Sequence, residues 1–139
     1  MKERALQLLG LMRRANAIAV GEVNTGSSVR GGKAKLLLLA ADASPNARDR
    51  AEGFAAGRDL ALVEMPFTKE EFSAAVGANG GSMAAVTDLG FANALLQLFA
   101  GGEPERYGTA AENIARRWNN ARETLPTRNK RIGKRRTNG

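Results

Sequence analysis

Hydrophobic positions along the chain alternate between helical and strand-like spacing. The first fifteen residues place four apolar side chains on one helical face: Ala5, Leu8, Leu9 and Met12. This spacing predicts a helix over 2–15 that stops near Asn16. The next apolar run, 17–20, ends at Gly21 and predicts a strand. Segment 22–32 stays open between helix and loop, because its glycines weaken a helix.

Three further strands follow, with helices between them. The run 36–41 is continuously apolar, which is typical of a strand covered on both faces, and the runs 60–65 and 83–87 predict two more. Helix starts are predicted where caps occur: Ser44 before Pro45, Thr68 paired with Glu71 in a capping box, and Asp88. This alternation of strands and helices predicts an α/β fold, a three-layer α/β/α sandwich.

The sequence beyond Gly102 is typical of an appendage. A second capping-box motif, Thr109 with Glu112, predicts a short helix with one apolar stripe: Ile114, Trp118, Ala121 and Leu125. We expect Trp118 to pack this helix on the body rather than to stack on a base. The predicted organisation is a compact domain over 1–102, a linker and short amphipathic helix over 103–125, and a disordered basic tail over 126–139.

Charge concentrates in the same C-terminal region. Residues 116–139 carry nine basic side chains and one acidic one, whereas residues 1–115 are close to neutral and the whole chain is +7. A near-neutral body with a cationic arm indicates a polyanionic partner. No apolar run approaches a membrane span and no signal peptide precedes the first helix, so we expect a soluble cytoplasmic protein that does not bind membranes.

Several kinds of chemistry are excluded by composition and spacing. The chain has no His and no Cys, which removes thiol nucleophiles, zinc fingers and the Ser-His-Asp triad. The segment around Gly32-Lys33 lacks the first glycine and the final hydroxyl of a P-loop, and no G-x-G-x-x-G follows a strand. We therefore expect a non-enzymatic protein without a metal, a cofactor or a small-molecule substrate.

The segment after the first predicted strand is the candidate binding surface. Asn side chains and helix-start N–H groups can bind base edges, while Arg and Lys neutralise phosphates. The candidate contacts are Gly21, Glu22, Asn24, Thr25, Ser27, Arg30 and Lys33. From the residues alone, a polar surface turn relaxed by glycines is an equal alternative.

Several short strings over residues 4–100 carry a family resemblance by their order and spacing. They are Leu9-Gly10-Leu11, Arg14-Ala15, Gly21-Glu22, Gly32-Lys33-Ala34-Lys35-Leu36, Asp42-Ala43-Ser44, Ala85-Val86-Thr87-Asp88 and Gly90-Phe91-Ala92. This pattern resembles the kink-turn RNA-binding superfamily of ribosomal protein L-seven-Ae, and more closely its small bacterial branch of the YlxQ type.

The resemblance implies a mixed four-stranded sheet and RNA binding through the loop and helix start after the first strand. It also implies help from the loop before the last strand, which here contains Asn79 and Ser82. Gly21 matches the family's glycine, and Asn24 stands where the family has Glu or Gln. Val23 and Ser27 replace an Asn or Lys and a Lys, so we expect a weaker or broader RNA preference.

The resulting hypothesis is a non-catalytic RNA-binding protein that acts on structured RNA, either kink-turn-like or ribosomal. The basic tail would add phosphate contacts through Arg128, Lys130, Arg131, Lys134, Arg135 and Arg136. A ribosome-associated or assembly adaptor, whose tail binds RNA non-specifically, is the alternative. A residual enzyme or nucleotide binder comes last.

Overall fold

One mixed sheet forms the centre of the molecule. The computed structural model describes residues 2–77, 79 and 81–134, with side chains through Glu123. Its strands are β1 (Ile18–Val20), β2 (Leu36–Leu39), β3 (Leu62–Glu64) and β4 (Met83–Val86). They lie in the order β1-β4-β2-β3, with β4 antiparallel to both neighbours and β2 parallel to β3. β1 and β3 are therefore the two edge strands.

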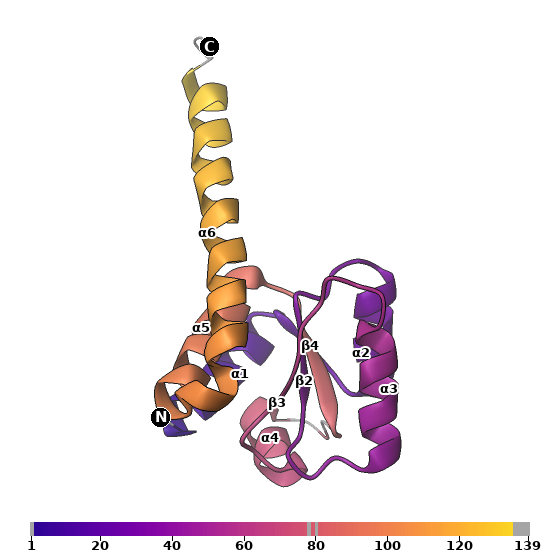
Figure 1. The fold of residues 1–139 in the computed structure, drawn as a ribbon. Helices are drawn as coiled ribbons and strands as arrows, with labels where there is room; N and C mark the ends of the chain where they lie inside the picture. Colours follow the sequence, from indigo (N-terminus) through magenta and orange to yellow (C-terminus); the bar gives the residue numbers. More distant parts are fainter. Residues whose placement is uncertain (1, 78, 80, 135–139) are drawn as a thin grey trace.

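Helices cover both faces of the sheet. They are α1 (Lys2–Arg14), α2 (Glu22–Arg30), α3 (Pro45–Ala55), α4 (Lys69–Val76), α5 (Leu89–Gly102) and α6 (Pro104–Lys134). Figure 1 shows α2 and α3 on one face and α1, α4 and α5 on the other, with α6 rising away from the body. The predicted α/β/α sandwich is confirmed. The segment 22–32, which the sequence left open between helix and loop, contains the helix α2.

The central strands are apolar on both faces because helices cover both. Leu36 and Leu38 join the main core beneath α1 and α5, whereas Leu37 and Leu39 pack under α2 and α3. All four are essentially inaccessible. The continuous run in the sequence thus reflects burial on two sides rather than a helix.

Local caps begin the helices as the sequence indicates. Thr68 and Glu71 form a reciprocal capping box, with N···O distances of 3.1 and 2.9 Å. The Ser44 hydroxyl accepts the Ala47 N–H, and Asp88 accepts the Phe91 N–H. These bonds satisfy first-turn N–H groups that the helix itself leaves unpaired.

The predicted boundary at Gly102 is wrong, because the compact body continues into α6. Only Glu103 separates α5 from α6, and its carbonyl accepts the Tyr107 N–H in the first turn of α6. Thr109 therefore lies inside a helix instead of capping one. Three α6 side chains are buried in the main core: Tyr107, Ala111 and Ile114. This burial makes the α5–α6 hairpin part of the domain.

Along the segment from Pro126 that the sequence predicts as a disordered tail, α6 runs without interruption to Lys134. A proline inside a helix removes one hydrogen bond and costs about 3 kcal/mol. Extending a helix that is already packed needs no new nucleation, however, so the helix continues past this position. Arg135 and Arg136 lie outside the described residues.

Candidate nucleic-acid interface

A polar hollow of about 500 Å³ runs along the outer edge of β1; we call it the β1 groove. Its polar lining residues are Arg13, Asn16, Asn24, Ser27, Ser28, Lys33 and Thr87. No acidic side chain lines it. The outer backbone groups of an edge strand also face this side, so the groove combines hydrogen-bonding groups with positive charge.

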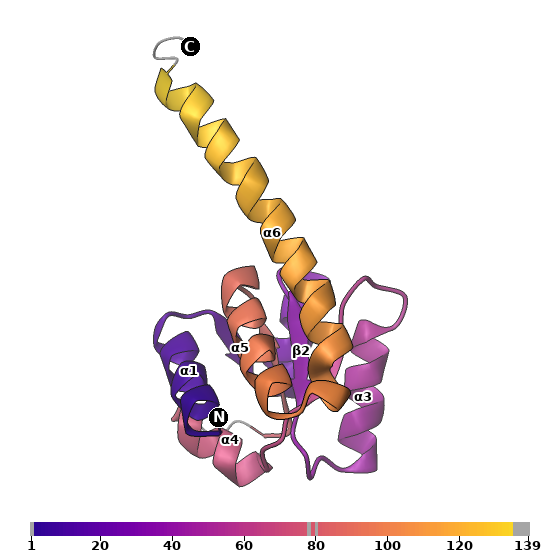
Figure 2. The ribbon, with the colours of Figure 1, turned by 60° about the vertical axis from the view of Figure 1, so that its left-hand side comes forward.

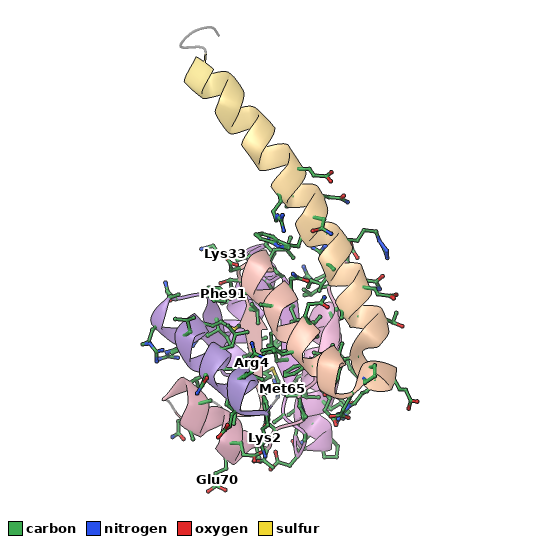
Figure 3. The ribbon with its side chains drawn as sticks, turned by 90° about the vertical axis from the view of Figure 1, so that its left-hand side faces the viewer. Lys2, Arg4, Lys33, Met65, Glu70 and Phe91 are labelled. Atoms are coloured by element: carbon green, nitrogen blue, oxygen red, sulfur yellow. The ribbon has the colours of Figure 1, made fainter. Side chains whose placement is uncertain are left out.

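Four separate segments build the β1 groove. α2 supplies Asn24 and Ser27, and the loop after α2 supplies Lys33. These three sequence-predicted residues are brought together. Figure 3 shows Lys33 at the end of the body beyond which α6 projects, opposite Lys2 and Glu70.

Sequence reasoning missed four lining residues: Arg13, Asn16, Ser28 and Thr87. Arg13 and Asn16 arrive because α1 leads directly into β1, and Asn16 takes a left-handed φ of 59° at the turn. Thr87 arrives because β4 pairs antiparallel with β1, so its N–H donates to the Ala17 carbonyl at 2.9 Å. Strand pairing, rather than a local motif, is the signal that places Thr87.

Gly21 opens α2 in a conformation that other residues avoid. Its φ of 94° and ψ of 164° lie in a region that is essentially restricted to glycine. Its N–H donates to the Met83 carbonyl at 2.9 Å, which ties it to the start of β4. No side chain caps α2, so its positive end is presented to the surface.

Asn24 is held in place by one hydrogen bond. Its amide Nδ2 donates to the Val20 carbonyl at 3.0 Å across the end of β1. An amide has a second N–H and a carbonyl oxygen, and this single bond leaves both for a ligand. Asn24 is thus an oriented polar group at the groove rather than a swinging surface side chain.

The neighbours of Asn24 point elsewhere. The Glu22 carboxylate pairs with Arg50 of α3 at 2.6 Å, which draws its charge away from the β1 groove. Val23 is 80% exposed, the larger of the two values among exposed large hydrophobic side chains of the described residues. An apolar side chain therefore stands in the open beside the polar groove.

Besides Glu22, two more predicted contacts on α2 do not line the groove. Thr25 is fully buried, and its hydroxyl has no hydrogen-bond partner in the described part of the chain. It lies on the α2 face that packs inward with Gly26 and Val29, so the prediction of a surface contact is wrong. Arg30 is exposed but does not line the groove, and its guanidinium lies near Gly26.

The loop before β4 approaches Gly21 through its backbone. Asn79 is exposed and Ser82 is partly exposed, and neither lines the β1 groove. The Ser82 carbonyl accepts the Ala40 N–H at 2.8 Å, while the adjacent Met83 carbonyl accepts from Gly21. The contact with Gly21 thus comes from the start of β4, while Asn79 and Ser82 lie outside the groove.

α6 leaves the body at the end where Lys33 lies (Figure 3). The predicted packing of Trp118 on the body is confirmed: a methyl group on Gly90 would lie 3.0 Å from the Trp118 ring. The guanidinium carbon of Arg122 lies over that ring, 5.8 Å from its centroid. The last turns of α6 carry four of the predicted tail contacts in their sequence: Arg128, Lys130, Arg131 and Lys134.

The described residues contain neither a candidate metal site nor a candidate membrane span. Residues 2–77, 79 and 81–134 contain no group of three His, Cys, Asp or Glu side chains that could hold a metal ion. Within the same residues, no helix combines the length and the hydropathy needed to cross a bilayer.

Comparison with known proteins places this chain beside small bacterial proteins. It is 37% identical over 95 residues to RNA-binding protein YlxQ of Bacillus subtilis (strain 168), covering 66% of this chain and 90% of that protein. RNA-binding protein YlxQ of Enterococcus faecium is 28% identical over 100 residues, covering 72% and 95%. No protein-family model matches the chain.

A solved structure shares the fold. It is a protein of unknown function from Bacillus halodurans C, with a TM-score of 0.62 and 24% identity over 68% of this chain and 94% of that one. At this identity the likeness supports the architecture alone. In each comparison about a third of this chain, or slightly less, has no counterpart.

Proposed function

The chain belongs to the YlxQ family, and from this premise we propose that it binds folded RNA through the β1 groove and the amino end of α2, without a catalytic step. Two relatives bear the name RNA-binding protein. The observation that carries the proposal is the convergence of four segments on one polar, acid-free groove beside an uncapped helix end.

Each part of the surface has a task in this proposal. Gly21 has no side chain to hold the RNA backbone away from α2. Asn24 reads a base edge with its spare N–H and oxygen, while Arg13 and Lys33 bind phosphates. A hydrogen bond to a charged group is worth about 1.5–3 kcal/mol, so two such contacts dominate the affinity of the groove.

A structured target with accessible base edges fits this surface best. RNA-binding proteins read unpaired or non-canonically paired bases, because the deep groove of an A-form helix excludes side chains. Sheared G·A pairs of a kink-turn-like or ribosomal RNA are such a target. Val23 cannot hydrogen-bond a base edge, so in this proposal it packs against a sugar or base and specificity rests on Asn24.

The basic part of α6 adds RNA affinity that does not depend on the sequence of the RNA. Nine basic residues follow position 115, and six of them follow Glu123. Phosphate contacts of this kind release counterions, so binding weakens by orders of magnitude when salt rises from about 50 to about 200 mM. The proposal therefore divides the work: the groove discriminates among RNAs and α6 strengthens binding to all of them.

Binding curves for three RNAs test this division. The probes are a kink-turn RNA, the same RNA without its G·A pairs, and an unstructured oligouridylate. Asn24→Ala should reduce discrimination between the first two by about tenfold, the upper value for one net hydrogen bond, and leave the salt dependence unchanged. The matched control is Asn46→Ala, an exposed asparagine on α3. Unaltered discrimination in Asn24→Ala would reject the site.

The basic tail is tested in the full-length chain. A truncation after Gly102 would strip Tyr107, Ala111 and Ile114 from the core, so the six basic residues after Glu123 are changed to Gln instead. This tail-neutral variant should bind all three RNAs more weakly, with a flatter salt dependence, and keep its preference for the intact kink-turn.

One observation favours the adaptor as a second candidate. A mostly apolar groove of about 640 Å³ lies between α1 and α5, lined by Leu8, Leu11 and Leu98, and Leu11 is 47% exposed. A protein partner could dock there. Equal binding of all three RNAs by the intact chain, lost in the tail-neutral variant, would support this candidate over the first.

A further inference from the structure

A second groove of about 780 Å³ lies at the opposite edge of the sheet, between β3 and α6. One wall is the segment 58–64, and the other is α6 from Arg106 to Arg117. We call it the β3 groove. Figure 2 shows the lower part of α6 beside α5, from where the helix rises away from the body. The proposed function assigns no task to this groove.

Arginines dominate the charge of the β3 groove: Arg58, Arg106, Arg116 and Arg117 line it. Its two acids are Asp59 and Glu64. The Glu64 carboxylate is already satisfied by Arg48 at 2.5 Å and Arg106 at 2.6 Å. The other three lining arginines form no ion pair within the described part of the chain. The groove therefore carries uncompensated positive charge.

The surroundings of Arg117 and Arg116 indicate which ligand this positive charge would bind. Arg117 is partly buried against the groove without a carboxylate partner in the described residues, and burying an unpaired charge is costly. Beside it, Arg116 donates to the Asn113 side-chain oxygen at 2.8 Å, which orients the guanidinium. Guanidinium groups fixed in this way suit phosphate oxygens, which they can bind in pairs.

The two grooves share no lining residue, but both have lining residues at the same end of the sheet. β2 and β3 are parallel, so the start of β3 at 58–61 lies beside the start of β2, and the Leu37 N–H donates to the Ala61 carbonyl at 2.9 Å. Lys33 and Lys35 immediately precede β2 at this same end. Three strand spacings, about 14 Å, separate the two edge strands. A single folded RNA can therefore reach both grooves across a basic end of the sheet.

We propose that the β3 groove is a second RNA contact, where Arg58, Arg116 and Arg117 bind backbone phosphates of the RNA held at the β1 groove. This inference rests on the proposed function. The ligand is RNA rather than an acidic peptide, because positive charge continues from the groove along α6 through Arg122 and the basic residues beyond. A long, evenly charged backbone matches that continuity.

Crosslinking tests the location of the RNA at each groove separately. The chain has no cysteine, so single substitutions give unique attachment points for a thiol-linked photocrosslinker. Asn113→Cys marks the β3 groove, Ser27→Cys marks the β1 groove, and Glu70→Cys is a control at the opposite end of the body (Figure 3). With the kink-turn RNA, both groove positions should give several times the yield of Glu70→Cys.

Charge removal tests the chemistry. Arg58→Gln with Arg117→Gln should lower affinity for the kink-turn RNA about tenfold and reduce the slope of log affinity against log salt by nearly 2, the value for two lost phosphate contacts. Preference for the intact RNA over the G·A-deficient RNA should stay unchanged. The matched control, Arg4→Gln with Lys69→Gln, removes the same charge from exposed positions outside both grooves.

The outcomes separate this inference from the proposed function. Crosslinking from Ser27→Cys but not from Asn113→Cys overturns the second contact and leaves the first. Crosslinking from Asn113→Cys alone rejects the β1 groove and keeps the phosphate site. The inference is also overturned if the groove variant and its charge control lose the same amount of RNA affinity. It is overturned as well if the groove variant binds a polyglutamate peptide more weakly than the unaltered chain but binds RNA equally well.

Discussion

The two edge strands of the sheet, β1 and β3, have different surroundings. At β1 the edge is open, and the groove beside it contains small polar groups, two basic residues and one anchored amide. At β3 the first turn of α6 contacts the end of the strand, where the Tyr107 hydroxyl donates to the Glu64 carbonyl, and a groove separates the two elements beyond that contact. Exposed strand edges invite pairing with other chains, so proteins usually cover or interrupt them.

Because of this difference, we expect the β3 edge to contribute to stability and the β1 edge to contribute to recognition. At the β3 edge, Tyr107 packs at 5.1 Å from the Phe99 ring and is almost inaccessible, so side chains there hold α6 on the body. At the β1 edge, Asn24 and Ser27 are exposed and bury little apolar area. We expect substitutions at the β3 edge to change folding first, and substitutions at the β1 edge to change binding with folding largely intact.

The largest expected effect is the loss of α6 packing. Tyr107→Ala should lower the free energy of unfolding by about 3–5 kcal/mol, because it empties a buried aromatic site and leaves the Glu64 carbonyl without its donor. Chemical denaturation measures this. Asn24→Ala serves as the comparison at the other edge and should cost about 1 kcal/mol. Similar losses at both positions would contradict the division between the edges.

The stability that Tyr107 contributes at the β3 edge should depend on pH. Burial raises the pKa of Tyr107 to about 12, above the value near 10 of an unfolded chain. The folded state therefore keeps the phenol proton to higher pH than the unfolded state. The stabilisation is full below pH 10 and is lost as pH rises from about 10 to about 12, by about 2–3 kcal/mol in total.

Tyr107→Phe isolates this contribution. It cannot ionise, so the extra loss of stability at alkaline pH should disappear relative to the unaltered chain. Tyr107 is the only tyrosine, which allows its ionisation to be followed directly by tyrosinate absorbance. An identical alkaline decline in both proteins would show that lysines, rather than Tyr107, cause it.

At the β1 edge, the backbone of Gly21 should matter more than the side chains. Gly21→Ala forces a side chain into a glycine-only region and should cost about 1–3 kcal/mol. The control is Gly53→Ala in α3, where a methyl group meets nothing within 4 Å and should stabilise the helix by about 0.5–1 kcal/mol. Thermal unfolding of both variants measures the contrast, and a neutral Gly21→Ala would contradict the strained turn.

The smallest expected effect concerns Glu22. Its ion pair with Arg50 is exposed, so Glu22→Gln should change the free energy of unfolding by less than about 1 kcal/mol. Removing a negative charge beside the β1 groove should strengthen RNA binding about two- to threefold at low salt. The matched variant Glu52→Gln, on the exposed part of α3, should leave binding unchanged. Equal gains in both would indicate a general charge effect.

Local patterns predicted the elements of the body well. The capping box at Thr68, the cap at Asp88 and the all-apolar β2 each depend on near neighbours or on the layer type, and each is confirmed. The C-terminal region was misjudged because two glycines and a capping-box motif indicated a break. Burial of Tyr107 and Ile114 outweighs those local signals.

The residues of the candidate site also fall into two groups: those that the sequence could identify and those whose position only the packing decides. Asn24, Ser27 and Lys33 could be chosen from the sequence because they follow a strand that ends in glycine. Thr25 could not be excluded, since only the packing of α2 decides which of its faces is buried.

The sequence by itself determined the four strands, the helices α1, α3, α4 and α5, the basic C-terminal arm and the absence of His and Cys, because these depend on spacing and composition. Only the tertiary structure decided which strands form the edges, that Arg13 and Thr87 join Asn24 in one groove, and that α6 and the segment 58–64 form the walls of another. The reason is physical: pairing order and helix packing are set by contacts between residues far apart in the chain, and no local pattern records them.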